Sequence, residues 1–158
     1  PITDDDSYKT LLEKAIDLCD KTLYEALVNI LNGNNPRIEQ KKIHPVGSYF
    51  GRRREGDEWI NWEWKTRRIF NFIRAITDPG PCAQTMFKDN IIKIRSSEEI
   101  PNSPDYICTP GEIVGKSSDF LIIKTGDSTL LINSYDNSDK KNDEILHTLR
   151  IGNRLYKP

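Results

Sequence analysis

The side chains best suited to chemistry lie together in one stretch, 48–54, which reads Ser-Tyr-Phe-Gly-Arg-Arg-Arg. Tyr49 and Phe50 offer two neighbouring aromatic rings, and such a ring can stack on a flat heterocycle such as a pyrimidine. Arg52 and Arg53 follow closely, and a guanidinium group can hold two phosphate oxygens through parallel hydrogen bonds. The combination predicts a site for a nucleotide-linked ligand, with these four residues as its binding groups.

A solvated basic turn is the alternative interpretation of the same stretch. Glu55, Asp57 and Glu58 follow the arginines directly. Opposite charges that are close in sequence often form a hydrated surface rather than a site. The residue types alone leave both interpretations open.

A metal site or a cysteine-based site has little support in the sequence. The only histidines are His44 and His147, and there is no Cys-x-x-Cys, so no metal site is predicted. Cys19, Cys82 and Cys108 are odd in number and widely spaced. This pattern indicates reduced thiols in a cytoplasmic protein rather than a disulfide framework.

Composition limits the classes of partner. The chain has 158 residues, a formal net charge of −1 and a pI of about 6.2, which argues mildly against a dedicated nucleic-acid binder. No apolar run approaches the roughly 20 residues needed to span a bilayer, so no membrane partner is predicted. Some basic residues that can meet phosphates are interspersed with acidic ones, which favours a solvated face: Arg67, Arg68, Arg74 and Lys88.

One long amphipathic helix is predicted from about Ser7 to Asn32, with Gly33 as its stop. Its apolar stripe needs a partner surface, which the rest of the chain does not fully supply. The stripe contains Leu12, Ile16, Cys19, Leu23 and Leu27. We expect these side chains to be exposed or to meet a neighbouring molecule, such as the second copy of a homodimer. Regular periodicity then stops over 34–58, which indicates a linker.

The remaining patterns predict an α+β fold. Ile60, Trp62 and Trp64 alternate as in a short strand that packs into a core, and Thr66 is expected to cap a second helix. The stretch 143–149 predicts a last helical turn. Five further short strands indicate a small antiparallel barrel of the OB type. They are Cys82–Phe87, Ile91–Arg95, Glu112–Gly115, Phe120–Lys124 and Thr129–Asn133.

Several of these segments resemble one known domain. Ile60-Asn61-Trp62, followed by the helical stretch 69–76 and Pro79, resembles the start of the C-terminal domain of the methionyl-tRNA/sugar N-formyltransferase family. In that domain Ile-Asp-Trp precedes a helix that ends in Ile-Arg-Ala. Further similar segments are Pro110-Gly111-Glu112-Ile113-Val114, Thr125-Gly126-Asp127-Ser128-Thr129-Leu130 and Gly152-Asn153-Arg154-Leu155. Ser128 stands where the family usually has a glycine.

The resemblance implies a division of the chain into three parts. Residues 1–33 are similar to the last helix of the family's Rossmann-like catalytic domain, 34–58 form the interdomain linker, and 59–158 form the C-terminal OB-like domain. That catalytic domain binds 10-formyltetrahydrofolate and uses an Asn, a His and an Asp near a His-x-Ser-Leu-Leu-Pro motif. The chain contains no such motif. We therefore assign no catalytic residue and expect this chain alone to be inactive.

The linker resembles the sugar-nucleotide branch of the family more than the tRNA branch. Phe50-Gly51-Arg52-Arg53 stands where tRNA enzymes tend to read Tyr-Ala-x-Lys-Leu. This implies that the intact enzyme moves a formyl group from 10-formyltetrahydrofolate to the amine of a nucleotide-linked amino sugar, with Tyr49 also at the substrate. Two alternatives stay open. One is a methionyl-tRNA formyltransferase, and the other is a non-catalytic OB-type module that binds nucleic acid or protein.

Overall fold

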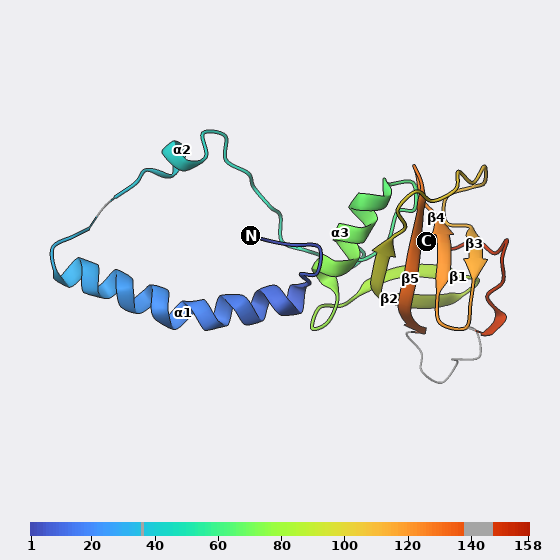
Figure 1. Cartoon of the computed structure of the whole chain (residues 1–158), viewed down its shortest axis with the longest axis horizontal. Helices are drawn as coiled ribbons and strands as arrows, with labels where there is room; N and C mark the ends of the chain where they lie inside the picture. Colours follow the sequence, from blue (N-terminus) through green and yellow to red (C-terminus); the bar gives the residue numbers. More distant parts are fainter. Residues whose placement is uncertain (36, 138–146) are drawn as a thin grey trace. The chain divides into compact units, whose positions relative to one another are not determined.

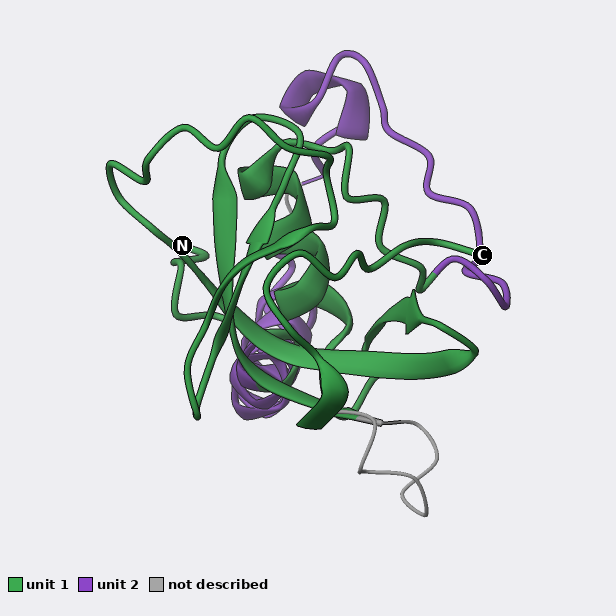
Figure 2. Ribbon diagram, turned by 90° about the vertical axis from the view of Figure 1, so that its right-hand side faces the viewer, with its two compact units in different colours: residues 1–9, 58–158 green, residues 10–57 purple. Residues whose placement is uncertain are grey.

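The computed structural model describes residues 1–35, 37–137 and 147–158, and these divide into two compact units (Figure 1). Residues 1–9 and 58–158 form the first, which we call the barrel unit, drawn in green in Figure 2. Residues 10–57 form the second, the helical unit, drawn in purple. Each unit is described by itself below.

An antiparallel sheet dominates the described part of the barrel unit. Its five strands have the spatial order β1-β2-β5-β4-β3, and every neighbouring pair is antiparallel. The strands are β1 Ala83–Phe87, β2 Asn90–Glu99, β3 Ile113–Lys116, β4 Leu121–Lys124 and β5 Thr129–Asn137. All five predicted strands are confirmed, although β2 and β5 run four residues further than expected. The α+β fold class is therefore confirmed.

The C-terminal segment links the two edges of this sheet. Met86 in β1 and Tyr156 exchange backbone hydrogen bonds of 2.8 and 3.0 Å. On the other side, the Leu155 amide donates to the Gly111 carbonyl at 2.8 Å, just before β3. Gly111 has a φ of +91°, and a Cβ atom there would lie 2.2 Å from the Leu155 carbonyl oxygen. Only glycine permits this close approach, which gives the sheet its barrel-like closure.

Helix α3, Thr66–Ile76, packs on β2 and covers the apolar interior (Figure 1). Ile69, Phe70 and Ile73 form its buried face, as their helical spacing predicts. The rest of the core is mostly aliphatic and comes from alternate positions of the strands, from Ile60 before α3 and from two residues near the C-terminus. Its fully buried members include Ile60, Ile92, Ile94, Ile113, Leu121, Ile123, Leu130, Ile132, Leu149 and Leu155.

The predicted strand around Ile60 is wrong. The Asn61 side chain accepts a hydrogen bond from the Glu63 amide at 3.0 Å, and the Trp64 amide donates to the Asn61 carbonyl at 3.1 Å. These bonds fold the chain into a turn instead of an extended strand. The expected packing of Trp62 is confirmed, because its side chain is 4% exposed and its Nε1 donates to Thr85 Oγ1 at 3.0 Å.

Thr66 does not cap α3 as predicted, because it is the first residue of the helix. The cap comes from the β4–β5 hairpin. Asp127 Oδ1 accepts hydrogen bonds from the Thr66 amide and from Thr66 Oγ1, both at 2.8 Å. Gly126 brings the hairpin close, since its amide donates to the Trp64 carbonyl at 3.0 Å. The hairpin thus fastens the start of the helix to the sheet.

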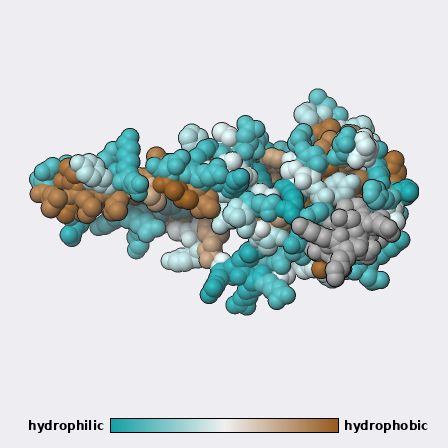
Figure 3. Space-filling view, turned by 90° about the horizontal axis from the view of Figure 1, so that it is seen from below, coloured by the Kyte–Doolittle hydropathy of each residue, from teal (hydrophilic) through white to brown (hydrophobic). Residues whose placement is uncertain are grey.

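The helical unit contains α1, which spans Tyr8–Leu31 and begins at the end of the barrel unit's N-terminal segment, and the short α2, Gln40–Ile43. The predicted helix and its stop are confirmed, with Gly33 at a φ of +72° and the Asn34 amide bonded to the Asn29 carbonyl. No residue of α1 is buried. The apolar stripe is exposed as expected, from 39% at Leu12 to 62% at Leu23, and Figure 3 shows apolar side chains gathered along this helix. The predicted turn at 143–149 lies largely outside the described residues, with 147–148 helical.

Candidate functional site

The predicted binding residues of the linker lie at the surface of the helical unit. Tyr49 is 100% exposed and Phe50 is 93% exposed, so nothing in the described part of their unit packs on their rings. Arg52 and Arg53 are exposed as well. The four side chains stand on irregular backbone after α2 rather than in a preformed pocket. They are accessible to a large partner.

A second group of basic and aromatic side chains lies on α3. Arg67, Asn71 and Arg74 are spaced four and three residues apart, which places them along one stripe of the helix. The Phe70 ring lies between the two arginines. Its centroid is 5.1 Å from Arg67 Cζ and 5.2 Å from Arg74 Cζ. These cation–π contacts hold both guanidinium groups in place.

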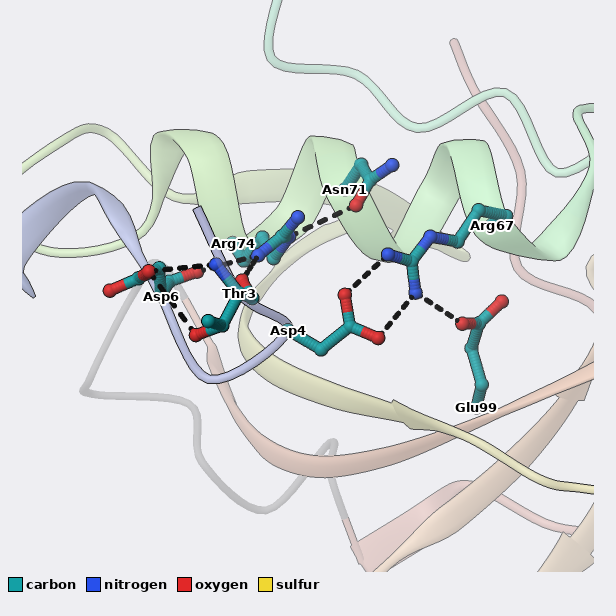
Figure 4. Close-up of polar contacts among 7 residues, drawn as sticks. All are labelled: Thr3, Asp4, Asp6, Arg67, Asn71, Arg74 and Glu99. Atoms are coloured by element: carbon teal, nitrogen blue, oxygen red, sulfur yellow. Dashed lines mark hydrogen bonds and ion pairs between the residues drawn. The ribbon is translucent and has the colours of Figure 1, made fainter. Parts of the chain in front are cut away.

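Arg67, near the start of α3, binds carboxylates from two distant parts of the chain (Figure 4). Arg67 Nη1 donates to Asp4 Oδ2 at 2.9 Å, and Arg67 Nη2 pairs with Asp4 Oδ1. Arg67 Nη1 also lies 2.7 Å from Glu99 Oε2 at the end of β2. The two nitrogens therefore grip Asp4 in the forked arrangement that guanidinium groups use for carboxylates and phosphates.

Arg74, nearer the end of α3, binds backbone carbonyl oxygens instead (Figure 4). Arg74 Nη1 donates to the Asp6 carbonyl oxygen at 3.0 Å and to the Thr3 carbonyl oxygen. Arg74 Nε donates to Asn71 Oδ1 at 3.0 Å. Asp6 closes the turn, because its Oδ2 accepts from the Thr3 amide at 2.9 Å and from Thr3 Oγ1 at 3.2 Å. Asp6 is only 4% exposed, so this turn is a fixed part of the barrel unit.

The contacts of Arg67 and those of Arg74 differ in their exposure to solvent. The side chains of Arg67 and Asp4 are 47% and 62% exposed, so their ion pair lies in water. The Arg67 guanidinium that bonds to it holds the pKa of Asp4 below its usual range, while Asp4 and Glu99 raise the pKa of Arg67 further. Exposed ion pairs of this kind contribute little to stability, because water screens them. This pair is thus permanently charged at neutral pH but weakly held.

The sequence did not reveal this cluster. Its residue types indicated only a solvated face on α3. Asp4 and Arg67 are 63 positions apart, and no periodic pattern links them. Only the packing of the N-terminal turn on α3 brings them together.

A third group surrounds Arg95 in β2. Arg95 Nη2 lies 2.9 Å from Asp136 Oδ2, and Arg95 Nη1 pairs with Asp78. The Cys82 thiol lies beside this pair and is 2% exposed. Burial, reinforced by the Asp78 charge, raises the pKa of the Cys82 thiol. The group fastens the end of α3 to the sheet, and its cysteine is not an activated nucleophile.

The described residues offer neither a metal site nor a membrane-spanning helix. Over 1–35, 37–137 and 147–158, no three His, Cys, Asp or Glu side chains come together as a metal site requires. No helix of the described chain has the length and apolar character needed to cross a membrane.

Sequence comparison places this chain among known proteins. The profile described as "Formyl transferase, C-terminal domain" matches residues 53–150. The methionyl-tRNA formyltransferase of Geobacillus thermodenitrificans is 31% identical over 131 residues, which cover 83% of this chain and 40% of that protein. The methionyl-tRNA formyltransferase of Staphylococcus aureus strain MW2 is 30% identical over 127 residues, which cover 80% and 39%. The chain thus spans about two fifths of the length of these relatives.

The fold is also found in a solved structure. A crystal structure of a variant of HypX from Aquifex aeolicus aligns with 89% of this chain and 24% of its own length, with a TM-score of 0.58. Its sequence identity of 17% limits the likeness to the fold.

Proposed function

Because this chain belongs to the formyltransferase family, whose C-terminal domain it contains, we propose that the intact protein formylates methionyl-tRNA. The formyl donor is 10-formyltetrahydrofolate, which the family uses. The amino group of the methionyl residue attacks the formyl carbon and forms a new C–N bond. The bond from that carbon to N10 of the folate breaks, tetrahydrofolate leaves, and the amine loses its extra proton to a base.

The observation that carries the proposal is the identity of about 30% to methionyl-tRNA formyltransferases over four fifths of this chain. Our sequence-based expectation of a nucleotide-linked amino sugar rested on Phe50, Gly51, Arg52 and Arg53 alone. The relatives do not support that acceptor. A tRNA acceptor agrees with their names and with a linker that is fully open to a large ligand.

The described chain contributes binding rather than chemistry in this proposal. The sequence has no match to the family's catalytic motif, so the folate, the base and the oxyanion donors belong to another part of the protein. Tyr49 and Phe50 offer exposed rings on which an unpaired base of the tRNA can stack. Arg52 and Arg53 offer guanidinium groups for its phosphates. The linker is thereby a contact point for the acceptor.

The acceptor is identified by offering the intact protein two amines in parallel, together with 10-formyltetrahydrofolate. One is methionyl-tRNA and the other is a dTDP- or UDP-linked amino sugar, with formylated product measured by mass spectrometry. We expect product from methionyl-tRNA only. Formylation of the sugar without formylation of methionyl-tRNA would refute the proposal and restore the sugar reading.

The role of the linker is tested by Arg52→Ala and Arg53→Ala in the intact protein. Each lost phosphate contact is worth about 1.5–3 kcal/mol, so kcat/KM for methionyl-tRNA should fall by about one to two powers of ten. The KM for 10-formyltetrahydrofolate should not change. Arg37→Ala is the matched control, because it removes the same charge from another exposed position of the helical unit. Equal losses in all three variants would show that only bulk charge matters.

A further inference from the structure

The positive charge of α3 is matched by acidic residues within the barrel unit. Lys65, Arg67, Arg68 and Arg74 supply four basic groups within ten residues. The turn 3–6 and the end of β2 bring acidic side chains to the same helix, two of them directly onto Arg67. We propose that Asp4 is an intramolecular cover on Arg67, which nucleic-acid phosphates displace when the acceptor binds. This inference rests on the proposed function, because it describes how the tRNA acceptor binds to α3.

The cover is held in place by contacts that do not involve the covered group. The turn 3–6 closes on the buried Asp6, and Arg74 grips two of its backbone carbonyls. Asp4 therefore stays next to Arg67 without depending on their ion pair. When its carboxylate rotates away, one N–H group on each of the two Arg67 nitrogens becomes available, while Nη1 keeps its contact with Glu99 at 2.7 Å. The fold of the barrel unit is not disturbed.

Arg67 is already arranged to receive a phosphate. Its guanidinium is stacked at 5.1 Å from the Phe70 centroid, so its direction is fixed before any ligand arrives. The two nitrogens that hold Asp4 present the same fork that binds two phosphate oxygens. Because Arg67 and Asp4 are about half exposed, exchange of one anion for another takes place in water at little cost.

A second cation, Arg68, lies one residue further along α3, and it contacts the ring of Trp64, which stands two residues before the helix. The Arg68 guanidinium stacks on the Trp64 ring, with Cζ 4.0 Å from its centroid. Basic groups interleaved with aromatic rings are typical of surfaces that bind single-stranded or looped nucleic acid. The start of α3 therefore offers more to a nucleic acid than the single covered guanidinium.

The cover also agrees with the near-neutral charge of the sequence. A domain that binds nucleic acid is usually basic, yet this chain has a net charge of −1. Carboxylates placed on the phosphate-binding groups lower the net charge without removing those groups. They weaken the binding of unrelated polyanions and reserve Arg67 for a ligand that makes additional contacts elsewhere.

The test compares Asp4→Asn with Asp5→Asn in the intact protein. Both changes remove one negative charge from the same turn, but only Asp4 is seen on Arg67. Affinity is measured by fluorescence anisotropy for two probes, a tRNA and inorganic polyphosphate, over a range of salt concentrations. We expect Asp4→Asn to tighten binding of both probes by about three- to ten-fold at low salt and to steepen the salt dependence by about one phosphate contact. Asp5→Asn should change affinity by less than about two-fold.

A second experiment tests whether the tighter binding of the Asp4→Asn protein depends on Arg67. In an Arg67→Gln protein, Asp4→Asn should no longer tighten binding, because the group that it uncovers is gone. Equal gains from Asp4→Asn and Asp5→Asn, or a gain that persists in the Arg67→Gln protein, would overturn the cover while leaving the tRNA proposal intact. If no variant binds tRNA but polyphosphate responds as expected, the cover stands and the proposed function fails.

Discussion

The bond between the β4–β5 hairpin and the start of α3 leads to a quantitative prediction about Asp127. Its carboxylate accepts from the Thr66 amide and hydroxyl, both at 2.8 Å. Asp127→Ala removes this cap and leaves one of the unpaired amides at the helix start without its partner. The Thr66 hydroxyl keeps its contact with Thr125 Oγ1 at 2.6 Å. The amide is thus the main group affected.

Loss of such a cap costs about 0.5–2 kcal/mol. Asp127 is exposed, so we expect a value of about 1 kcal/mol. For a unit of this size, that loss lowers the melting temperature by about 4 °C or slightly more. Trp59, Trp62 and Trp64 all lie in the barrel unit, so tryptophan fluorescence follows its unfolding separately from α1.

The charge of Asp127 adds a pH dependence with a definite sign. The Thr66 amide that donates to it holds the pKa of the Asp127 carboxyl below its usual range in the folded chain. A group with a lowered folded pKa stabilises the fold at pH values above its unfolded pKa, about 3.9, and loses this effect as pH falls through the folded value. Asp127→Asn should therefore destabilise the barrel unit at pH 7 by about 0.3–1 kcal/mol. The difference from the original protein should shrink below about pH 4.

Asp89→Asn is the matched control, because it removes the same charge from the β1–β2 turn. It should leave the melting temperature within about 2 °C of the original at every pH. The capping argument is refuted if the Asp127→Ala protein has the same melting temperature as the original protein. It is equally refuted if the Asp127→Asn difference is the same at pH 3 and pH 7.

Other substitutions test the packing around this hairpin and the exposed helix. Gly126→Ala should destabilise the barrel unit by about 1–3 kcal/mol in urea unfolding, because a Cβ atom there would lie 2.1 Å from a backbone oxygen. Gly47→Ala is the control and should have no effect, because nothing lies within 4 Å of the added Cβ. Trp62→Phe should cost about 1–3 kcal/mol in the same assay, because it removes the donor to Thr85 at 3.0 Å; a loss below about 0.5 kcal/mol would contradict this. Leu23→Lys should leave barrel unfolding unchanged and reduce the binding of an apolar dye, because Leu23 is 62% exposed.

Local signals predicted most of the elements. Gly33 has the positive φ that ends α1, and Lys88 and Asp89 form the turn between the two predicted strands β1 and β2. The extension of β2 to Glu99 was missed, because its last residues are polar and pair with β5 after two register shifts. Hydrophobic alternation cannot mark a strand end that faces water and is held by backbone bonds and polar side-chain contacts.

Contacts between distant residues were beyond the reach of such signals. The false strand at Ile60 had the correct alternation, and the side-chain amide of Asn61 overrode it by closing a turn. Asp127 and Thr66 are 61 positions apart, and neither residue alone indicates the other. Charge pairs and caps made across a fold depend on how two elements pack, and a single sequence carries no periodic trace of that packing.

The motifs that carry the family resemblance have structural roles wherever their surroundings are described. Gly111 allows the C-terminal strand to approach, Gly126 and Asp127 fasten the hairpin to α3, and Arg74 of the Ile-Arg-Ala segment holds the N-terminal turn. Residues constrained by packing specify the barrel and not the ligand. These motifs are therefore evidence for the fold, and the proposed acceptor rests on the identity to the named relatives over four fifths of the chain. The residues free to vary with the acceptor are those that do not pack against the rest of the chain. The linker is the clearest example, because the ring of Tyr49 within it is fully exposed.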